Sequence, residues 1–174
     1  MEITLEQLLS ARDARAEQIA ILRKRYGGAC VVAFTVVAPG PDKQTPEARR
    51  LFDAGIKALQ SFMLRYEIAA LAFEAEEKPT GSEAYLVIRT DPVFLKTALC
   101  ALEESAPYGR LWDMDVVKPD GRRVDRGDVG LEERGCIVCG KPGRACYSRR
   151  LHPMEEVLGA VKKLADTLKD NQTL

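Results

Sequence analysis

The sequence predicts an α+β fold, in which a mixed sheet carries flanking helices and is followed by a small Cys/His-rich appendage with a C-terminal helix. Two observations predict it. Segments whose apolar residues recur at helical spacing alternate with shorter runs rich in β-branched residues. The 174 residues, 46% hydrophobic and 30% charged, have the size and composition of one globular domain. We therefore expect a single domain over 1–174, with a core at 1–130 and the appendage at 131–174.

The first half of the chain is expected to form a helix, a strand and a second helix. The helix covers Thr4–Arg25, and its first four residues have the spacing of a capping box. A buried strand is expected over Ala29–Val37, because this run is rich in β-branched residues. The next helix covers Thr45–Met63 and starts with a Thr-Pro pair, which places proline at the first helical position.

The second half is expected to add a hairpin, a helix and a further pair of strands. Ile68–Glu76 and Glu83–Arg89 read as two strands joined by a loop that contains proline and glycine. Asp91–Glu104 repeats the helix-start chemistry of an N-cap residue followed by proline. Leu111–Val117 is a strand that a Pro-Asp-Gly turn returns towards a short partner near Arg123-Val124.

Charge and hydropathy argue against two classes of partner, although local basic patches remain possible. The 26 basic and 26 acidic side chains balance, whereas nucleic-acid binders usually carry a surplus of Lys and Arg. The N-terminal residues have no basic leader, and the longest apolar run, Ala29–Ala38, is about half of a membrane span. We therefore expect a cytoplasmic protein with neither nucleic-acid nor membrane partners. Its five cysteines then favour metal binding, catalysis or burial over disulfides.

Two aspartates mark a candidate catalytic site. Asp113 and Asp115 are one residue apart in an expected strand, so their side chains leave the same face, roughly 6 to 7 Å apart at the backbone. Carboxylates at this spacing can hold Mg²⁺, which in turn binds substrate phosphates. The alternative is an exposed strand face, which often carries such a pair without function.

The residues before the pair suggest contacts to a phosphate. Gly109 permits close approach of the backbone to a ligand, and Arg110 supplies a planar fork of donors. The alternative is that Gly109 ends a turn and that Arg110 forms a surface ion pair.

Four segments together resemble a known family. They are Gly109–Val116, Arg126–Gly130, Phe34–Lys43 and the early Ala11–Asp13. In this combination the sequence resembles the holo-acyl-carrier-protein synthases of citrate lyase, which are apo-citrate lyase phosphoribosyl-dephospho-CoA transferases. The likeness spans most of the chain.

The resemblance implies a nucleotidyltransferase reaction and a nucleotidyltransferase-like fold. The implied donor is 2′-(5″-triphosphoribosyl)-3′-dephospho-CoA, and the implied acceptor is a serine of the apo acyl carrier subunit of citrate lyase. Pyrophosphate leaves as the phosphodiester forms. Mg²⁺ on Asp113 and Asp115 would gather the triphosphate. Asp128 or Asp125 is the candidate third carboxylate, although Asp128 is as readily a cap and Asp125 a turn residue.

The turn at Pro39, Gly40 and Lys43 is a second candidate for substrate binding. It follows a buried strand and precedes a helix N-terminus, where unpaired amides attract anions. Taken alone it reads as a stiff connection with a solvated lysine. The resemblance favours a role in binding the substrate.

The cysteine-rich segment precedes an expected closing helix over Pro153–Leu168. Three thiols and an imidazole form a ligand set typical of structural zinc: Cys136, Cys139, Cys146 and His152, the only histidine. The alternative is a reduced loop of buried cysteines in which His152 caps the helix. A further alternative makes Arg149 and neighbouring basic residues a rim for phosphates or for an acidic carrier protein.

Three other functions remain open from the sequence. The same transfer can serve the carrier protein of malonate decarboxylase. An adenylyl transferase that uses ATP would need the same carboxylates, because a metal holds any triphosphate in a similar way. A zinc-containing module that binds a partner without catalysis is the third.

Overall fold

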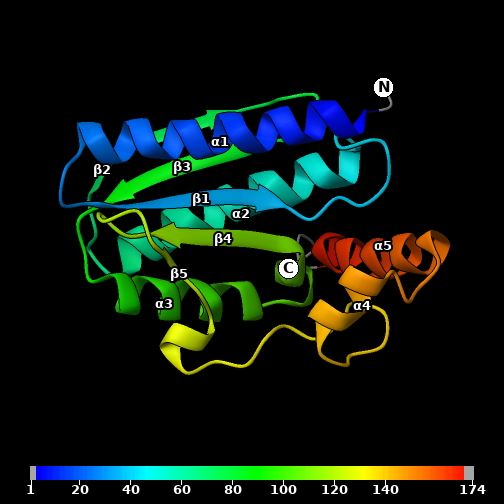
Figure 1. The fold of residues 1–174 in the computed structure, drawn as a ribbon. Helices are drawn as coiled ribbons and strands as arrows, with labels where there is room; N and C mark the ends of the chain where they lie inside the picture. The colour runs from blue at the N-terminus through cyan, green and yellow to red at the C-terminus, as the bar shows by residue number, and fades with distance from the viewer. Residues whose placement is uncertain (1–2, 171–174) are drawn as a thin grey trace.

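The structure, a computed structural model, describes residues 3–170 (Figure 1). Every helix and strand expected from the sequence is present. In chain order the elements are α1 (Leu5–Arg25), β1 (Cys30–Val36), α2 (Pro46–Arg65), β2 (Ala70–Glu76), β3 (Glu83–Ile88), α3 (Pro92–Glu104), η1 (Pro107–Leu111), β4 (Trp112–Val117), β5 (Arg123–Val124), η2 (Gly127–Val129), α4 (Gly143–Arg149) and α5 (Met154–Asp170). The short helix α4 was not expected, because the sequence indicated only a loop over Cys136–His152.

The sheet is antiparallel throughout, so the expected mixed sheet is wrong. Its strand order is β2-β3-β1-β4-β5, and all four neighbouring pairs run antiparallel. The helical crossovers β1-α2-β2 and β3-α3-β4 each join parallel strands but leave room for one strand between them. That strand is β3 in the first case and β1 in the second. This is the split βαβ connectivity of ferredoxin-like domains, and the nucleotidyltransferase-like arrangement stays a prediction.

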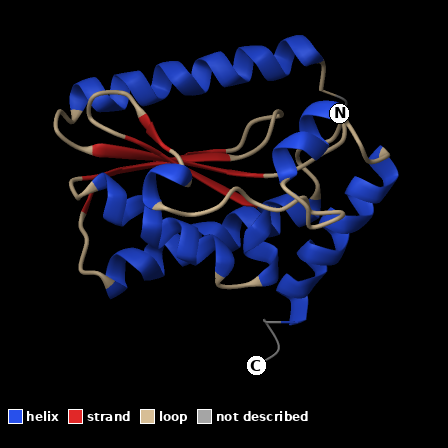
Figure 2. Ribbon diagram, turned by 60° about the horizontal axis from the view of Figure 1, so that its bottom comes forward, coloured by secondary structure: helices blue, strands red, loops and turns tan. Residues whose placement is uncertain are grey.

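The two faces of the sheet are covered unequally (Figures 1 and 2). Helices α2 and α3 cover one face, where the main core contains Val32, Phe34, Leu86 and Met114. Helix α1 covers the other face with a smaller cluster and contributes only Leu22 as a fully buried residue. Because α1 buries so little apolar surface, this face retains space for polar side chains.

A close approach of α2 to the sheet depends on Gly55. A Cβ atom built there would lie 2.7 Å from Cε1 of Phe34 and closer still to Cζ. The Phe34 ring has no room to move, because it stacks on Phe52 at 5.1 Å and meets Trp112 edge-on at 6.5 Å. Glycine therefore sets the distance between α2 and β1.

The C-terminal helix packs against the start of α2 and against η1. In α5, Ala165 and Leu168 are buried in one cluster with Leu51 of α2 and Leu111 of η1. Figure 1 shows α4 and α5 at the end of the sheet where β1 ends and β4 begins. None of the described helices is long and apolar enough to span a membrane.

Candidate functional site

Asp113 and Asp115 lie on the α1 face of the sheet, as expected from their spacing. In the register of β1 and β4, Asp113 lies opposite Thr35 and Asp115 opposite Ala33. Met114 between them is buried in the main core on the other face. Thr35 also pairs with Glu83 of β3, so a row of polar residues crosses three strands.

Asp113 is the least compensated acid of this face. Its carboxylate has no hydrogen bond or ion pair with any described residue, and it opens to solvent at the base of a recess. Surrounding protein atoms desolvate the carboxylate and raise its pKa, and the negative charge of Asp115 raises the pKa further. The cations Arg134, Lys96 and Arg123 offset only part of this effect.

Asp115 has a partner on the neighbouring strand. Arg123 of β5 donates a hydrogen bond to its carboxylate and forms an ion pair with it. This bond, with the charges of Asp115, Asp113 and Asp125, raises the pKa of Arg123. The two aspartates therefore differ, one held in place and the other open.

The recess above Asp113 is a polar cavity of about 270 Å³. Its lining joins four segments of the chain: Arg15, Thr35, Val36, Val37, Ala38, Lys43, Thr80, Gly81, Ser82 and Asp113. The ammonium of Lys43 donates to Ala38 O at 2.6 Å, and burial lowers its pKa. Lys43 and Asp113 thus line the same cavity, although the sequence indicated them as two separate candidates for substrate binding.

A buried acid, Glu83, anchors α1 at this cavity. Its carboxylate accepts hydrogen bonds from Arg15 at 2.6 Å, Tyr85 at 2.7 Å and Lys78 at 3.1 Å. Burial alone would raise the pKa of Glu83, but these donors outweigh it and the pKa is lowered. Sequence reasoning missed Arg15 and Glu83. The available signal was the alternation Glu83-Ala84-Tyr85, which puts the acid on the face of Asp113.

Gly109 and Arg110 contact other parts of the fold, and their role in binding the substrate stays a prediction. A Cβ atom at Gly109 would lie 2.5 Å from Glu103 O, so glycine permits η1 to pack on α3. Arg110 donates to Gly135 O at 2.5 Å and to the Tyr147 hydroxyl at 3.3 Å. Neither residue lines the cavity of Asp113.

The predicted third carboxylate also lies elsewhere. Asp128 accepts a hydrogen bond from the backbone of Asp125 at 2.9 Å, which is a local cap. Its segment η2 packs on α3 through Val129, on the face of the sheet opposite Asp113. Arg149 is exposed in the last turn of α4 and lines none of the described cavities.

Three charged side chains take the place of a strand beside the start of β4. Strand β5 pairs only with Val116 and Val117, so the backbone before them has no strand on its outer side. Glu103 accepts the Met114 N–H at 2.8 Å, and Lys96 donates to Met114 O at 2.9 Å. Arg134 donates to Trp112 O at 2.8 Å and forms an ion pair with Glu103. These bonds fix the backbone on both sides of Asp113.

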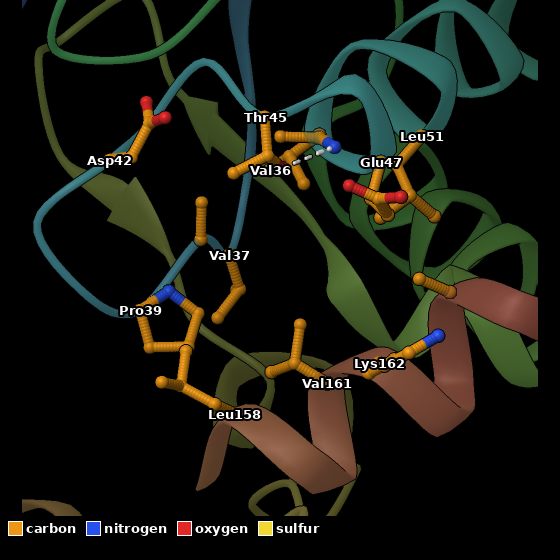
Figure 3. A pocket seen from close by; sticks show the side chains of 13 residues that line it. Val36, Val37, Pro39, Asp42, Thr45, Glu47, Leu51, Leu158, Val161 and Lys162 are labelled. Atoms are coloured by element: carbon orange, nitrogen blue, oxygen red, sulfur yellow. Dashed lines mark hydrogen bonds between the residues drawn. The ribbon is translucent and has the colours of Figure 1, made fainter. Parts of the chain in front are cut away.

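Two further cavities share a wall with the polar one. Val37 and Ala38 line all three, and Pro39 lines both of the others. One cavity, of about 310 Å³, lies between the start of α2 and α5, where Leu158 and Val161 face Val37 and Pro39 (Figure 3). The other, of about 680 Å³, extends from Pro39 to the Cys-rich segment. Gly40, at φ +89°, turns the chain beside Leu158.

The predicted zinc ligands converge. Cys136, Cys139, Cys146 and His152 each offer a ligand atom, and these atoms all lie within 4.8 Å of one another. All three cysteines are free thiols. Residues 136–152 thus bring these four side chains together.

The sequence matches the family described as apo-citrate lyase phosphoribosyl-dephospho-CoA transferase over residues 3–168. Relatives named apo-citrate lyase phosphoribosyl-dephospho-CoA transferase, from Escherichia coli O139:H28 (strain E24377A / ETEC) and Shigella boydii serotype 18 (strain CDC 3083-94 / BS512), are each 33% identical to this chain over 162 residues. The alignment covers 93% of this chain and 88% of each relative. The resemblance drawn from the four sequence segments is confirmed, and the chain belongs to the apo-citrate lyase phosphoribosyl-dephospho-CoA transferase family.

Proposed function

We propose that this chain transfers the 2′-(5″-phosphoribosyl)-3′-dephospho-CoA group from its triphosphate precursor to a serine of the apo acyl carrier subunit of citrate lyase, releasing pyrophosphate. The reaction is of the nucleotidyltransferase type. The observation that carries the proposal is the cavity that Asp113 and Lys43 both line, with Asp115 on the same face of the strand as Asp113. Family membership supports it, because the relatives are named for a transferase of this group.

The two carboxylates fit a magnesium ion. Asp113 has a raised pKa and no partner among the described residues, so a cation placed beside it would relieve both the desolvation and the repulsion from Asp115. Asp115 is already held by Arg123 and would enter as the fixed ligand. Magnesium held there would neutralise charge on the transferred phosphoryl group and on the departing pyrophosphate.

The chain's own cations would bind the rest of the triphosphate. Lys43 reaches the cavity from the turn after β1, and its ammonium is stabilised at present by one carbonyl. A phosphate oxygen beside it would favour the charged form that burial disfavours. Thr35 and Ser82 line the same space and add hydroxyl donors. This assignment leaves Asp128 as a local cap.

The donor also has an apolar part, and the neighbouring cavities suit it. The pantetheine arm of dephospho-CoA is long and mostly uncharged, unlike its triphosphate. On the other side of Val37–Pro39, the cavity between α2 and α5 is lined by Leu51, Leu158 and Val161. We assign the triphosphate to the polar cavity and the arm to this apolar one, with Val37–Pro39 between them.

The test is a transfer assay read by mass spectrometry. The protein is incubated with Mg²⁺ and one apo carrier protein, that of citrate lyase or that of malonate decarboxylase. Each carrier is tested with triphosphoribosyl-dephospho-CoA and, separately, with ATP. We expect the mass of the carrier to increase only with the CoA derivative. A gain only with ATP would favour an adenylyl transferase, and a gain only on a malonate decarboxylase carrier would replace the acceptor. No gain with either donor on either carrier would contradict the catalytic assignment.

Asp113→Asn tests the carboxylate in the same assay. We expect a fall in turnover of about 10² to 10³-fold, the size seen when a group that stabilises transition-state charge is removed. The matched control is Asp120→Asn, because Asp120 lies in the exposed turn after β4 and contacts Arg122. Near-normal turnover of Asp113→Asn would remove Asp113 from the site. Equal losses in both variants would show that the effect is not specific to the cavity.

A further inference from the structure

We propose that Cys136, Cys139, Cys146 and His152 bind one Zn²⁺, and that this ion holds residues 134–152 in the position from which Arg134 supports β4. The inference is separate from the transfer reaction, because the ion would lie outside the cavity of Asp113. It concerns what keeps β4, the strand that carries Asp113 and Asp115, in place.

The donor set has the chemistry and spacing of tetrahedral zinc. With zinc–sulfur bonds of about 2.3 Å, two sulfurs on a tetrahedron lie about 3.8 Å apart. The Sγ atoms of Cys139 and Cys146 are 3.7 Å apart. Three thiols with one imidazole form a closed ligand set of the structural kind, which leaves no position for a substrate.

His152 supplies an independent indication of a ligand. Its Nε2 atom is buried and has no hydrogen-bond partner among the described residues. A buried polar nitrogen without a partner disfavours the folded state, and a bond to a metal would satisfy it. The other ring nitrogen, Nδ1, faces Glu156 at 3.6 Å. Histidine ligands commonly have such a carboxylate on the nitrogen that does not bind the metal.

The backbone around the cluster has the turns that a Cys-x2-Cys pair requires. The Val138 N–H points to Cys136 Sγ at 3.5 Å, and the Gly140 N–H donates to Cys136 O at 2.9 Å. Gly140 adopts φ +73°, which other residues rarely reach. This turn wraps the chain around the sulfur of Cys136.

Two arginines join residues 134–152 to the rest of the fold, one to β4 and the other to η1, which directly precedes β4. Arg134, two residues before the first ligand, donates to Trp112 O at 2.8 Å and pairs with the buried Glu103. Arg110 donates from the other side to Gly135 O at 2.5 Å. Glu103 also accepts the Met114 N–H. The position of residues 134–152 therefore affects the position of the backbone on both sides of Asp113.

The first experiment measures metal in full-length protein purified without chelator. We expect about one zinc per chain and, after exchange into Co²⁺, the thiolate charge-transfer and d–d bands of a tetrahedral site. Cys139→Ala should bind zinc at least about tenfold more weakly in competition with a chelator. Cys139 is exposed, so little packing is lost with its side chain. The control Cys100→Ala, at a buried cysteine outside the cluster, should keep its zinc.

The second experiment measures amide hydrogen exchange in the wild-type protein before and after zinc is removed. We expect faster exchange at Met114, whose amide is held by Glu103, and little change at Val87 in β3, which pairs with a strand on each side. A wild-type protein without zinc and without the Co²⁺ bands would overturn the site. Bound zinc whose removal leaves exchange at Met114 unchanged would overturn the coupling to β4. Neither readout depends on transferase activity.

Discussion

At the scale of single residues, the ionised carboxylate of Asp113 lowers the stability of the folded protein. Asp113 lies in a recess without a hydrogen-bond partner among the described residues, next to a second carboxylate, and its pKa is raised. Such an arrangement disfavours the ionised folded protein and favours whatever cation or proton relieves it. The carboxylate that we assign to magnesium is therefore one whose ionised form the fold disfavours.

A pH-dependent stability measurement tests this conflict. The pKa of Asp113 is higher in the folded chain than in the unfolded chain. Between these two pKa values the folded chain keeps a proton that the unfolded chain has lost, so the free energy of unfolding falls as pH rises through this range. Asp113→Asn should therefore unfold at higher urea than wild type at neutral pH, and the difference should vanish below about pH 3.9. Urea unfolding across this range, without divalent cations, is the measurement.

Asp120→Asn is the matched control, with the opposite sign. Hydrogen bonds from the backbone and side chain of Arg122 lower the pKa of Asp120, so its ionised form favours folding above the unfolded value. The variant should lose stability at neutral pH. If Asp113→Asn also loses stability there, the raised pKa of Asp113 is wrong.

The sequence predicted single residues well where strand geometry or the local spacing of residues decides their place. Asp113 and Asp115 share a face because side chains alternate along a strand, and no other information was needed. Arg110 was assigned to the same ligand because it is close in sequence. It lies in η1, however, where the backbone turns, and its guanidinium points to Gly135. Contacts between residues so distant in sequence have no local signal.

At the scale of elements, the packing of α2 on β1 makes a testable contrast between two glycines. Gly55→Ala would place a methyl group against the immobile ring of Phe34. The clash should outweigh the gain in helix propensity and lower the free energy of unfolding by about 1–2 kcal/mol. Gly159→Ala in α5 meets no atom within 4 Å and should raise it by about 0.5–1 kcal/mol. Chemical denaturation measures both, and equal effects would contradict the close approach.

The elements themselves were predictable, but their order in the sheet was not. Capping residues such as Thr4, Thr45 and Asp91 accept the expected backbone hydrogen bonds at their helix starts. The pairing of β1 with both β3 and β4 depends on contacts between distant segments. A mixed sheet was expected, but a strand lies between the two parallel strands of each crossover, and this makes every neighbouring pair antiparallel.

At the scale of the whole molecule, α5 closes the domain. It covers Leu51 and Leu111, both at most 2% exposed. Exposing either side chain to water would lower the free energy of unfolding by about 1.5–3 kcal/mol. Because the stability of a whole domain is about 5–15 kcal/mol, a chain that ends at residue 153 should lose cooperative unfolding. Far-UV circular dichroism in urea measures this, with the exposed-site variant Lys163→Ala as the control. A shortened chain with an unchanged midpoint would make α5 an independent appendage.

The structure also gives the protein a built-in optical reporter. Trp112 is the only tryptophan in the chain, and its indole donates to Leu51 O at 2.8 Å while its ring meets Phe34 and Tyr108. Its backbone carbonyl is the acceptor of Arg134, and the next residue is Asp113. Its emission therefore comes from one known place, at the residue that precedes Asp113 and accepts the hydrogen bond of Arg134. The protein needs no added dye for its fluorescence to report on the strand that carries them.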